Sequence, residues 1–463
     1  MIELSNVSFR YEGAEKNVLT DISLTIKSGE CVVLTGASGC GKTTITRLIN
    51  GLIPHFYTGE VHGTVVIDGV DCFSLEPHEL AEKVGSVFQN PRTQFFNTDT
   101  DSEIVFGMEN CAVPYEEMHR RYECTVKELN LENLCGRDIF TLSGGQKQSI
   151  AFGSVHALAP DIYILDEPSA NLDRESIQRL KNVLTALKQM GKTILVSEHR
   201  LYYLRELADR YVLVDDGKIK DIYDAATLLG KTLDQLHNLG LRSLHDTNIE
   251  LGTSGCDNGT PALEVKNIYV ARGQTEIIRG ASMEVGRGEI VGIVGQNGVG
   301  KTTLARTICG LMREKKGGVL FNGVPIKPKK RKQHIFLVMQ DPNFQLFSDS
   351  VEAELELTVS GEKPDEAYTQ QLLKELDLDA VREKHPLALS GGQKQRVCIA
   401  LAVLSGAEVL LFDEPTSGLD YKNMRRVADM LCMLAARGKA IAVISHDNEF
   451  LSETCTRIVD LSK

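Results

Sequence analysis

The chain has 463 residues, 42% of them hydrophobic and 25% charged, which is typical of a globular protein of about two to four domains. Its 63 acidic and 51 basic side chains give a net charge of −12, which argues against a protein whose main work is to grip a nucleic-acid backbone. No run of about 18–20 apolar residues is present to span a membrane, no secretory signal opens the chain, and the 11 cysteines form no C-x-x-C pair, so we expect a reducing cytosol and neither a disulfide framework nor a zinc site.

Short apolar runs alternate with helical patterns along the chain, and the whole pattern occurs twice. The runs at residues 31–34, 162–165 and 193–196 have partners at 290–294, 409–412 and 440–444. Runs this short and rich in β-branched residues suit strands that are buried in a parallel sheet and covered by helices. The sequence therefore predicts an α/β protein with two tandem domains, in which each polar motif follows the end of a strand.

The join between the two copies is expected where the apolar pattern fades. Residues 253–261 are small and polar, and we interpret them as a tether. The predicted boundaries are 1–235 for the first domain, 236–260 for the linker and 261–463 for the second domain.

The first strand of each half is followed by a glycine-rich loop, G-x-x-x-x-G-K-T, and then by an apolar helix. Glycines let backbone N–H groups turn toward an anion, and the helix presents its positive end. The lysine is expected to reach the outer phosphates and the first threonine to hold Mg²⁺. A purely structural glycine turn is the alternative, but two matches in register disfavour it. The residues expected to bind nucleotide are Gly36, Ser38, Gly39, Cys40, Gly41, Lys42, Thr43 and Thr44, and Gly295, Asn297, Gly298, Val299, Gly300, Lys301, Thr302 and Thr303.

Leu-Ser-Gly-Gly-Gln-Lys-Gln opens a predicted helix at residues 142–148 and again at 389–395. The serine is expected to cap the helix, and the glycines leave the helix N–H groups open to an anion. A helix cap alone is the alternative. Because the motif accompanies two phosphate loops, we expect two halves that face each other, each lending this loop to the other's nucleotide. The residues are Ser143, Gly144 and Gly145, and Ser390, Gly391 and Gly392.

A later strand in each half ends in Asp-Glu-Pro, at Asp166-Glu167 and Asp413-Glu414. The aspartate is suited to bind Mg²⁺ through water, and the glutamate to polarise the attacking water. The alternative is a helix cap, because this tripeptide can also open a helix. Recurrence beside a phosphate loop favours the catalytic interpretation.

The last motif of each half is a histidine after a strand. Ser197-Glu198-His199 is aligned with Ser445-His446, with one residue of slack before the histidine. A lone histidine in this place is ordinarily a satisfied structural residue. Its repetition after matching strands favours a catalytic role.

This order of motifs resembles the ATP-binding domain of ABC transporters, and the resemblance covers nearly the whole chain twice. It implies that each domain has a mainly parallel sheet core, an antiparallel β part and a helical subdomain, with ATP and Mg²⁺ as cofactors. It further implies that Gln89 and Gln340 sense Mg²⁺ and couple to a membrane partner, that the loops at Leu172-Asp173 and Leu419-Asp420 contact the opposite half, and that both histidines contact the γ-phosphate. An aromatic residue before the first glycine loop stacks on adenine in this family, and Tyr11 fits that place.

The resemblance implies two composite ATP sites, and we expect both to hydrolyse ATP. One joins Lys42, Thr43, Gln89, Asp166, Glu167 and His199 to Ser390 and Gly392. The other joins Lys301, Thr302, Gln340, Asp413, Glu414 and His446 to Ser143 and Gly145. The expected Mg²⁺ ligands are Thr43, Gln89 and Asp166, and Thr302, Gln340 and Asp413.

Departures from the family pattern predict modest asymmetry between the sites. Arg272 stands where the first half has Tyr11, and Tyr269 is out of register. The helix after the serine motif carries Ser149 in the first half and Arg396 in the second.

Residues 51–60 and 89–96 resemble the ATPases of energy-coupling factor (ECF) importers, especially those with both domains fused. This resemblance implies a motor at the cytoplasmic face of the membrane, bound to a transmembrane scaffold (T-type) protein and a small substrate-capturing membrane protein. The cargo implied is a vitamin, a vitamin precursor or a metal ion. The sequence cannot tell which, because the ATPase does not touch the cargo.

An apolar and then acidic stretch follows each glutamine. It consists of Phe95, Phe96, Asp99, Asp101 and Glu103, and of Leu346, Phe347, Asp349, Glu352 and Glu354. Such a stretch is suited to receive a coupling helix that bears arginines, although a solvated acidic face is the alternative. On the first interpretation, charge reversal at Glu103 together with Glu352 is expected to release the membrane partner.

Other classes of two-domain ABC ATPase share the duplication. Fused sugar-importer ATPases usually have a degenerate second phosphate loop, unlike residues 295–303. Those that act on the ribosome typically join their halves by a long charged helix, which the tether here does not resemble. Repair ATPases insert coiled coils or zinc modules, for which there is no room. Sedimentation with membranes or with ribosomes would separate the first two classes.

Overall fold

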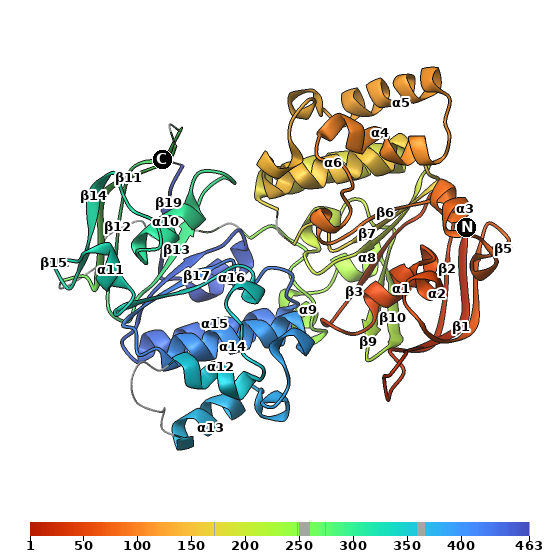
Figure 1. The fold of residues 1–463 in the computed structure, drawn as a ribbon. Coiled ribbons are helices and arrows are strands. Elements are labelled where there is room, and N and C mark those ends of the chain that lie inside the picture. Colours follow the sequence, from red (N-terminus) through yellow and green to blue (C-terminus); the bar gives the residue numbers. More distant parts are fainter. Residues whose placement is uncertain (171, 248, 250–259, 274, 359–365, 463) are drawn as a thin grey trace. The chain divides into compact units, whose positions relative to one another are not determined.

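The computed structural model in Figure 1 describes all residues except 171, 248, 250–259, 274, 359–365 and 463. The described chain forms two compact units, Met1–Asp246 and Thr247–Lys463. Most of the predicted tether lies outside the described residues. Among the described residues, every helix is too short or too polar to cross a bilayer.

The first unit contains two sheets. The antiparallel sheet has the order β2-β1-β4-β5, and the larger sheet has the order β10-β9-β3-β8-β7-β6. All neighbours from β9 to β6 are parallel, and only β10 pairs antiparallel with β9. The predicted strands at residues 31–34, 162–165 and 193–196 are therefore confirmed as neighbours in a parallel sheet. The strands are β1 (Ile2–Tyr11), β2 (Leu19–Ile26), β3 (Cys31–Gly36), β4 (Gly59–Ile67), β5 (Val70–Asp71), β6 (Val84–Val87), β7 (Ile162–Asp166), β8 (Thr193–Ser197), β9 (Arg210–Asp215) and β10 (Lys218–Asp224).

Three helices of the first unit form a small body of their own. α4, α5 and α6 lie together at one end of the unit in Figure 1, around a core that includes Ile104, Met108, Val126 and Ile150. This is the helical subdomain that the family resemblance implied. The helices are α1 (Lys42–Ile49), α2 (Leu52–His55), α3 (Pro77–Lys83), α4 (Thr100–Asn110), α5 (Tyr115–Glu128), α6 (Gly144–Ala157), α7 (Arg174–Gln189), α8 (Ala225–Leu229) and α9 (Leu233–Asn238).

The second unit repeats this plan. An antiparallel sheet has the order β12-β11-β14-β15, and a parallel sheet has the order β16-β17-β18-β13-β19. Its strands are β11 (Leu263–Arg272), β12 (Thr275–Val285), β13 (Ile290–Val294), β14 (Lys316–Phe321), β15 (Val324–Pro325), β16 (Ile335–Val338), β17 (Val409–Asp413), β18 (Ala440–Ile444) and β19 (Arg457–Asp460). Its helices are α10 (Lys301–Ile308), α11 (Pro328–Arg331), α12 (Val351–Thr358), α13 (Glu366–Glu375), α14 (Gly391–Leu404), α15 (Tyr421–Ala436) and α16 (Asn448–Thr454).

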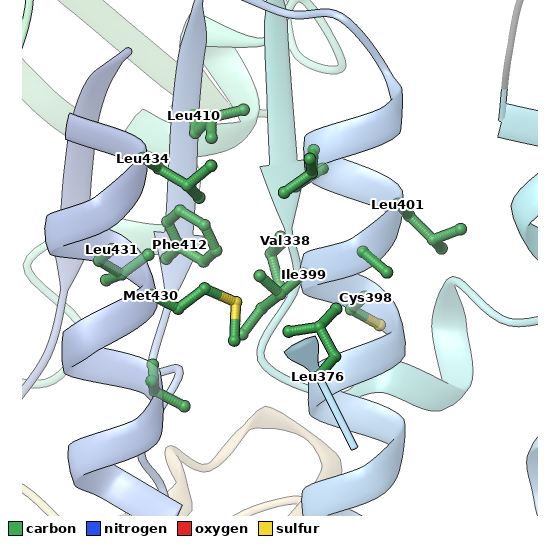
Figure 2. Packing of buried hydrophobic residues seen from close by; sticks show 14 of the residues in the cluster. Val338, Leu376, Cys398, Ile399, Leu401, Leu410, Phe412, Met430, Leu431 and Leu434 are labelled. Atoms are coloured by element: carbon green, nitrogen blue, oxygen red, sulfur yellow. The ribbon is translucent and has the colours of Figure 1, made fainter. Parts of the chain in front are cut away.

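The parallel strands are buried on both faces, which explains why their sequences are apolar throughout rather than alternating. In the second unit, Phe412 of β17 and Val338 of β16 pack against Ile399 of α14 and Leu431 of α15 (Figure 2). All four side chains are fully buried, so this core holds the ends of β16 and β17 in place beside the polar motifs that follow them. The ten described cysteines form no disulfide.

Candidate functional site

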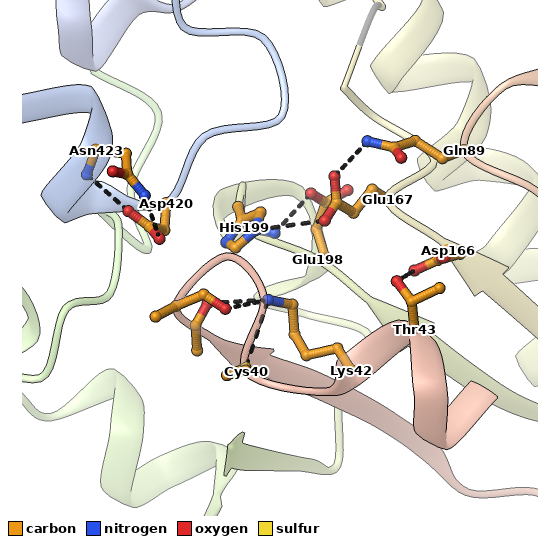
Figure 3. A network of polar contacts seen from close by, with 12 residues as sticks. Cys40, Lys42, Thr43, Gln89, Asp166, Glu167, Glu198, His199, Asp420 and Asn423 are labelled. Carbon is orange, nitrogen blue, oxygen red and sulfur yellow. Dashed lines mark hydrogen bonds and ion pairs between the residues drawn. The ribbon is translucent and has the colours of Figure 1, made fainter. Parts of the chain in front are cut away.

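The first glycine loop lies between β3 and α1, as predicted. Gly36 has φ +139°, and a Cβ there would lie 2.0 Å from the carbonyl oxygen of Val214, so only glycine fits. The buried Lys42 ammonium donates to the carbonyl oxygens of Gly36 (3.0 Å) and Ala37 (2.9 Å), as Figure 3 shows. The loop thus holds a positive charge at the start of a helix, where an anion is favoured.

Cys40 lies inside this loop and packs there. Its side chain is buried, its Sγ is 3.8 Å from the Lys42 ammonium, and burial raises the pKa of its thiol. Because the thiolate is the reactive form, the structure favours a packing role for Cys40 over a reactive one.

The end of β7 brings the Asp-Glu pair to this loop. The Thr43 hydroxyl donates to Asp166 Oδ1 at 3.2 Å, so the two predicted Mg²⁺ ligands lie side by side. Glu167 has φ +44°, a strained value for a residue with a Cβ, and such strain is common at functional sites. Its carboxylate accepts from Gln89 Nε2 at 2.6 Å and lies 3.4 Å from His199 Nε2. The first unit therefore gathers all of its own predicted catalytic side chains in one place (Figure 3).

The second unit builds the same kind of site. Lys301 donates to the carbonyl oxygens of Gly295 (2.8 Å) and Gln296 (3.1 Å). Glu414, at φ +51°, repeats the strained conformation, and its Oε1 lies 3.6 Å from His446 Nε2.

The two histidines differ in their contacts. His446 Nε2 also lies 2.9 Å from Asn297 Oδ1 of the phosphate loop, and its backbone N–H donates to Glu414 Oε2 at 3.3 Å. The backbone N–H of His199 instead donates to Glu198, for which the sequence predicted no function.

Asp413 is buried and Asp166 is half-buried, and the loss of water around each carboxyl is the main cause that raises its pKa. For Asp166 the charge of Glu167 raises the pKa further. A hydrogen bond from Thr43 opposes the rise at Asp166, as a hydrogen bond from Thr302 does at Asp413. Both shifts mean that the ionised form costs free energy in the folded protein without a cation beside it.

Asp166→Asn is therefore expected to raise the melting temperature of the nucleotide-free protein at pH 7. Because the folded pKa lies above the ordinary value of 3.8, this carboxyl lowers the free energy of unfolding as pH rises from about 4 through the folded pKa. The gain from Asp166→Asn should thus shrink toward pH 4. Thermal unfolding between pH 4 and pH 8 measures it, with the exposed Asp161→Asn as control, and a variant less stable than wild type at pH 7 would contradict this account.

The two serines of the Leu-Ser-Gly-Gly-Gln motifs cap their helices. Ser143 Oγ accepts from the N–H of Gln146 at 3.3 Å, and the Gln146 side chain accepts from the N–H of Ser143 at 2.9 Å. Ser390 and Gln393 form the same reciprocal pair at α14. The local cap is confirmed, and a contact with the other half's nucleotide stays a prediction.

Tyr11 lies beside the first phosphate-loop helix. Its hydroxyl is 3.2 Å from Thr44 Oγ1 and accepts from Arg47 at 3.0 Å. Tyr269 lies elsewhere, between Gly280 and Lys316 on the antiparallel sheet, as its register predicted. The side chain of Arg272 lies outside what the structure describes.

A pocket of about 230 Å³ lies behind the serine motif of the first unit. Its lining includes Ser149 and Asn130, which correspond to Arg396 and Asp377 of the second unit. There the buried Arg396 donates to the side chain of Asn423 (3.3 Å) and lies 3.9 Å from Asp377. The first unit is hollow here because a serine replaces the arginine.

The double variant Ser149→Arg/Asn130→Asp is expected to fill this pocket and raise the melting temperature by about 2–4 °C, since cavity filling stabilises by about 1 kcal/mol. Ser149→Arg alone should gain less, because its charge then lacks the carboxylate partner. Differential scanning calorimetry compares the variants, and equal or lower melting temperatures would show that the pocket does not accept an arginine.

Glu103, in the acidic stretch after Gln89, was expected to receive an arginine of a coupling helix, and the structure gives it another role. Glu103 is 2% exposed, and its Oε2 accepts from the N–H groups of Phe96 (3.0 Å) and Asn97 (2.8 Å). Glu354 holds residues Phe347 and Ser348 in the same way, at 2.7 Å each. The expectation that Glu103 receives an arginine was wrong, because this buried carboxylate is hydrogen-bonded to the backbone of its own loop.

The strands before the two histidines correct the alignment of Ser197-Glu198-His199 with Ser445-His446. β8 pairs with β3 in the same register as β18 pairs with β13. Ser197 therefore corresponds to Ile444, and Glu198 corresponds to Ser445. No slack before the histidine is needed. The constant spacing of 247 residues between the later motifs already carried this signal.

Comparison with known proteins agrees with this geometry. The sequence profile of the ABC transporter family matches residues 19–170 and 278–417. A Treponema denticola protein, provisionally named an ABC transporter ATP-binding protein, is 48% identical, with 100% of this chain and 95% of that protein covered. Bacillus subtilis YkoD, provisionally named an HMP/thiamine import ATP-binding protein, is 32% identical, with 100% of this chain and 90% of YkoD covered.

Among solved structures, a model of ribosome-bound archaeal Pelota and ABCE1 matches with a TM-score of 0.70 and 21% identity, covering 98% of this chain and 76% of the matched chain. At this identity the match shows a shared fold. Together with the two profile matches and the motifs in both sheets, these likenesses show that the chain belongs to the ABC transporter ATP-binding family and carries two copies of its domain.

Proposed function

We propose that this protein is the ATP-hydrolysing subunit of an energy-coupling factor importer, with two composite ATP sites where its halves face each other. The observation that carries the ATPase part is that each unit keeps a complete set of a phosphate-loop lysine, a Thr–Asp pair, a strained glutamate and a histidine beside it. The importer part is supported by the resemblance of residues 51–60 and 89–96 to ECF ATPases and by the relative named for HMP/thiamine import.

The residues of both units fit ATP and Mg²⁺. Lys42 is held by carbonyl oxygens, so its charge is available to a phosphate. The threonine hydroxyl, the aspartate carboxylate and the glutamine amide oxygen form an all-oxygen donor set, which Mg²⁺ prefers. Mg²⁺ would be held by Thr43, Asp166 and Gln89 in the first unit and by Thr302, Asp413 and Gln340 in the second. It would neutralise charge on the β- and γ-phosphates.

The protein's own groups then act on the water and the γ-phosphate. Glu167 and Glu414 orient and polarise the attacking water, and the neighbouring histidines donate toward the γ-phosphate. Gln89 Nε2 donates to the Glu167 carboxylate, so the amide that would help to hold Mg²⁺ and the carboxylate that would orient the water lie next to each other. The raised pKa of Asp166 is expected to fall when Mg²⁺ binds beside it.

We propose that exposed apolar side chains form the docking surface for the membrane partner. Phe96 is 74% and Phe140 is 75% exposed, and the N–H of Ile139 donates to the carbonyl of Thr98, which joins the two segments that carry them. The second unit repeats the pair with the exposed Phe347 and Leu387. Exposed apolar groups of this size at matching places suit the apolar face of a coupling helix.

Phe96→Asp together with Phe347→Asp is expected to abolish co-purification with the membrane proteins while ATP binding by the isolated subunit persists. A charge buried in the interface would cost several kcal/mol of binding free energy. Met190→Asp, at another exposed apolar position, is the control. Mass spectrometry of the co-purifying proteins identifies the partners, and an unchanged pull-down from the double variant would reject this surface.

The same preparation separates the importer from a ribosome-associated ATPase. Sedimentation of the protein with membranes, and its absence from ribosome fractions, is expected for the importer. The reverse distribution would favour a ribosome-associated ATPase. A co-purifying sugar-importer permease would favour the ATPase of a sugar importer.

A further inference from the structure

The loops after β8 and β18 hold His199 and His446, and three of the differences between them involve a buried carboxylate or a residue near it. Their strands run in the same register, so the loops can be compared residue by residue. The corresponding pairs are Glu198 and Ser445, Arg200 and Asp447, and Tyr203 and Phe450. Each loop therefore has one buried carboxylate, but this carboxylate precedes the histidine in the first unit and follows it in the second.

In the first unit the carboxylate of Glu198 accepts four hydrogen bonds. Oε1 accepts from the N–H groups of His199 (2.7 Å) and Arg200 (3.1 Å). Oε2 accepts from the N–H of Ser169 (3.2 Å) and from the hydroxyl of Tyr203 (2.9 Å). Glu198 is 2% exposed, so these bonds are made away from water, where charge-assisted hydrogen bonds are strong.

These bonds join two segments of the site. Ser169 lies two residues after Glu167, and the N–H of Glu167 itself donates to the carbonyl of Ser197. Glu198 thus ties the backbone of His199 to the segment that carries Glu167. Figure 3 shows Glu198 next to His199 and Glu167. A shift of either segment would change the position of the histidine relative to the glutamate.

In the second unit the carboxylate of Asp447 makes the corresponding link. Its Oδ2 accepts from the hydroxyl of Thr416 at 3.0 Å, and Thr416 corresponds to Ser169. Its Oδ1 accepts from the N–H of Phe450 at 3.3 Å, and its own N–H donates to Ser445 Oγ at 3.1 Å. Asp447 is also buried.

We propose that Glu198 is the positioning residue of the first hydrolytic centre, where its buried carboxylate replaces the one that Asp447 supplies in the second. Glu198 does not touch the nucleotide in this scheme. It acts through His199 and through the segment after Glu167, and the proposal rests on the proposed function of these two residues in ATP hydrolysis.

The other two exchanges follow from burying a carboxylate at position 198. Tyr203 supplies a hydroxyl donor that Phe450 lacks. Arg200 supplies a buried positive charge where the second unit has an acid, and its guanidinium donates to the carbonyls of Ser169 (3.4 Å) and Leu172 (3.5 Å). Carboxylates at both 198 and 200 would bring two like charges together, and each unit has a carboxylate at only one of these two corresponding positions.

The first test uses Glu198→Gln in a Glu414→Gln background, so that turnover reports on the first centre. Glutamine keeps the shape but turns an N–H₂ group toward backbone donors. We expect kcat to fall at least tenfold with the KM for ATP within about twofold, because the phosphate loop is untouched. Hydrogen exchange in the nucleotide-free protein should quicken at the amides of Ser169, His199 and Arg200. The exposed Glu206→Gln is the control.

The second test moves the carboxylate. Glu198→Ser/Arg200→Asp/Tyr203→Phe installs the residues of the second unit, and Ser169 retains a hydroxyl donor at the place of Thr416. We expect this triple variant to recover most of the kcat and of the exchange protection that Glu198→Gln loses, whereas Glu198→Ser alone should not. Failure of the rescue, or normal kcat and exchange in Glu198→Gln, would overturn the proposal. If the Glu414→Gln parent hydrolysed no ATP, the proposed function of the first centre would fail, and exchange protection and its rescue would still decide whether Glu198 positions the histidine loop.

Discussion

Glu167→Gln and Glu414→Gln are each expected to remove about half of the ATP turnover, and the double variant to remove nearly all of it. Glutamine keeps the size of the side chain but cannot accept a proton from the attacking water, and loss of a general base typically costs 10²–10⁴-fold at the affected site. Both glutamates have the same strained backbone and a histidine within 3.6 Å, so neither site is built to be inactive.

Steady-state phosphate release measures this turnover, and equilibrium binding of MgATP should stay near wild type because the phosphate loops are unchanged. Glu175→Gln, an exposed glutamate at the start of α7, is the control. Loss of nearly all activity from one change and none from the other would exclude two working sites.

Gly144→Asp and Gly391→Asp are expected to disable one site each, namely the site of the opposite half. Both glycines are the first residues of their helices, and a Cβ at either would meet no described atom within 4 Å. An aspartate in the first turn favours the helix through the macrodipole, so folding should be retained. The same charge would repel a γ-phosphate held against this helix end, which should cost the affected site at least 10²-fold.

Pairing these variants with the glutamate variants tests the composite arrangement. If the loop of Ser390 serves the nucleotide on Lys42, then Gly391→Asp should add no loss to Glu167→Gln but should abolish the activity left by Glu414→Gln. Gly144→Asp should behave in the opposite way. Alanine at the same glycines is the neutral control. If Gly391→Asp instead adds its loss to Glu167→Gln and not to Glu414→Gln, each half encloses its own nucleotide and the composite scheme fails.

Much of the site could be predicted from sequence because its motifs are local. The strand before each phosphate loop is an apolar run of about five residues, and the loop, lysine and helix follow without interruption, so spacing alone places Lys42 and Lys301. The helix caps at Ser143 and Ser390 are equally local, since donor and acceptor lie three residues apart. The duplication then predicted the parallel strands of the second unit from those of the first.

The partners of the polar side chains could not be predicted, because burial and hydrogen-bond geometry depend on how the chain folds around each side chain. Glu103 looked like a surface acid among other acids, and only the fold showed that it is buried against the backbone of residues 96 and 97. From the sequence, the exchange of Ser149 for Arg396 indicated only a modest asymmetry between the halves, whereas the packing around Ser149 leaves a pocket. Glu198 had no motif of its own, and its four donors come from residues 169, 199, 200 and 203.

What the sequence alone determined was therefore the order of strands and loops, the two phosphate cradles and the residues that follow each strand, because these depend on spacing along the backbone. The tertiary structure decided which carboxylates are buried and what they hold, since burial and hydrogen-bond geometry depend on which distant segments pack together. The two halves show this most directly. The position before the predicted catalytic histidine carries a buried carboxylate in one half and a serine in the other, and only their packed surroundings explain the difference.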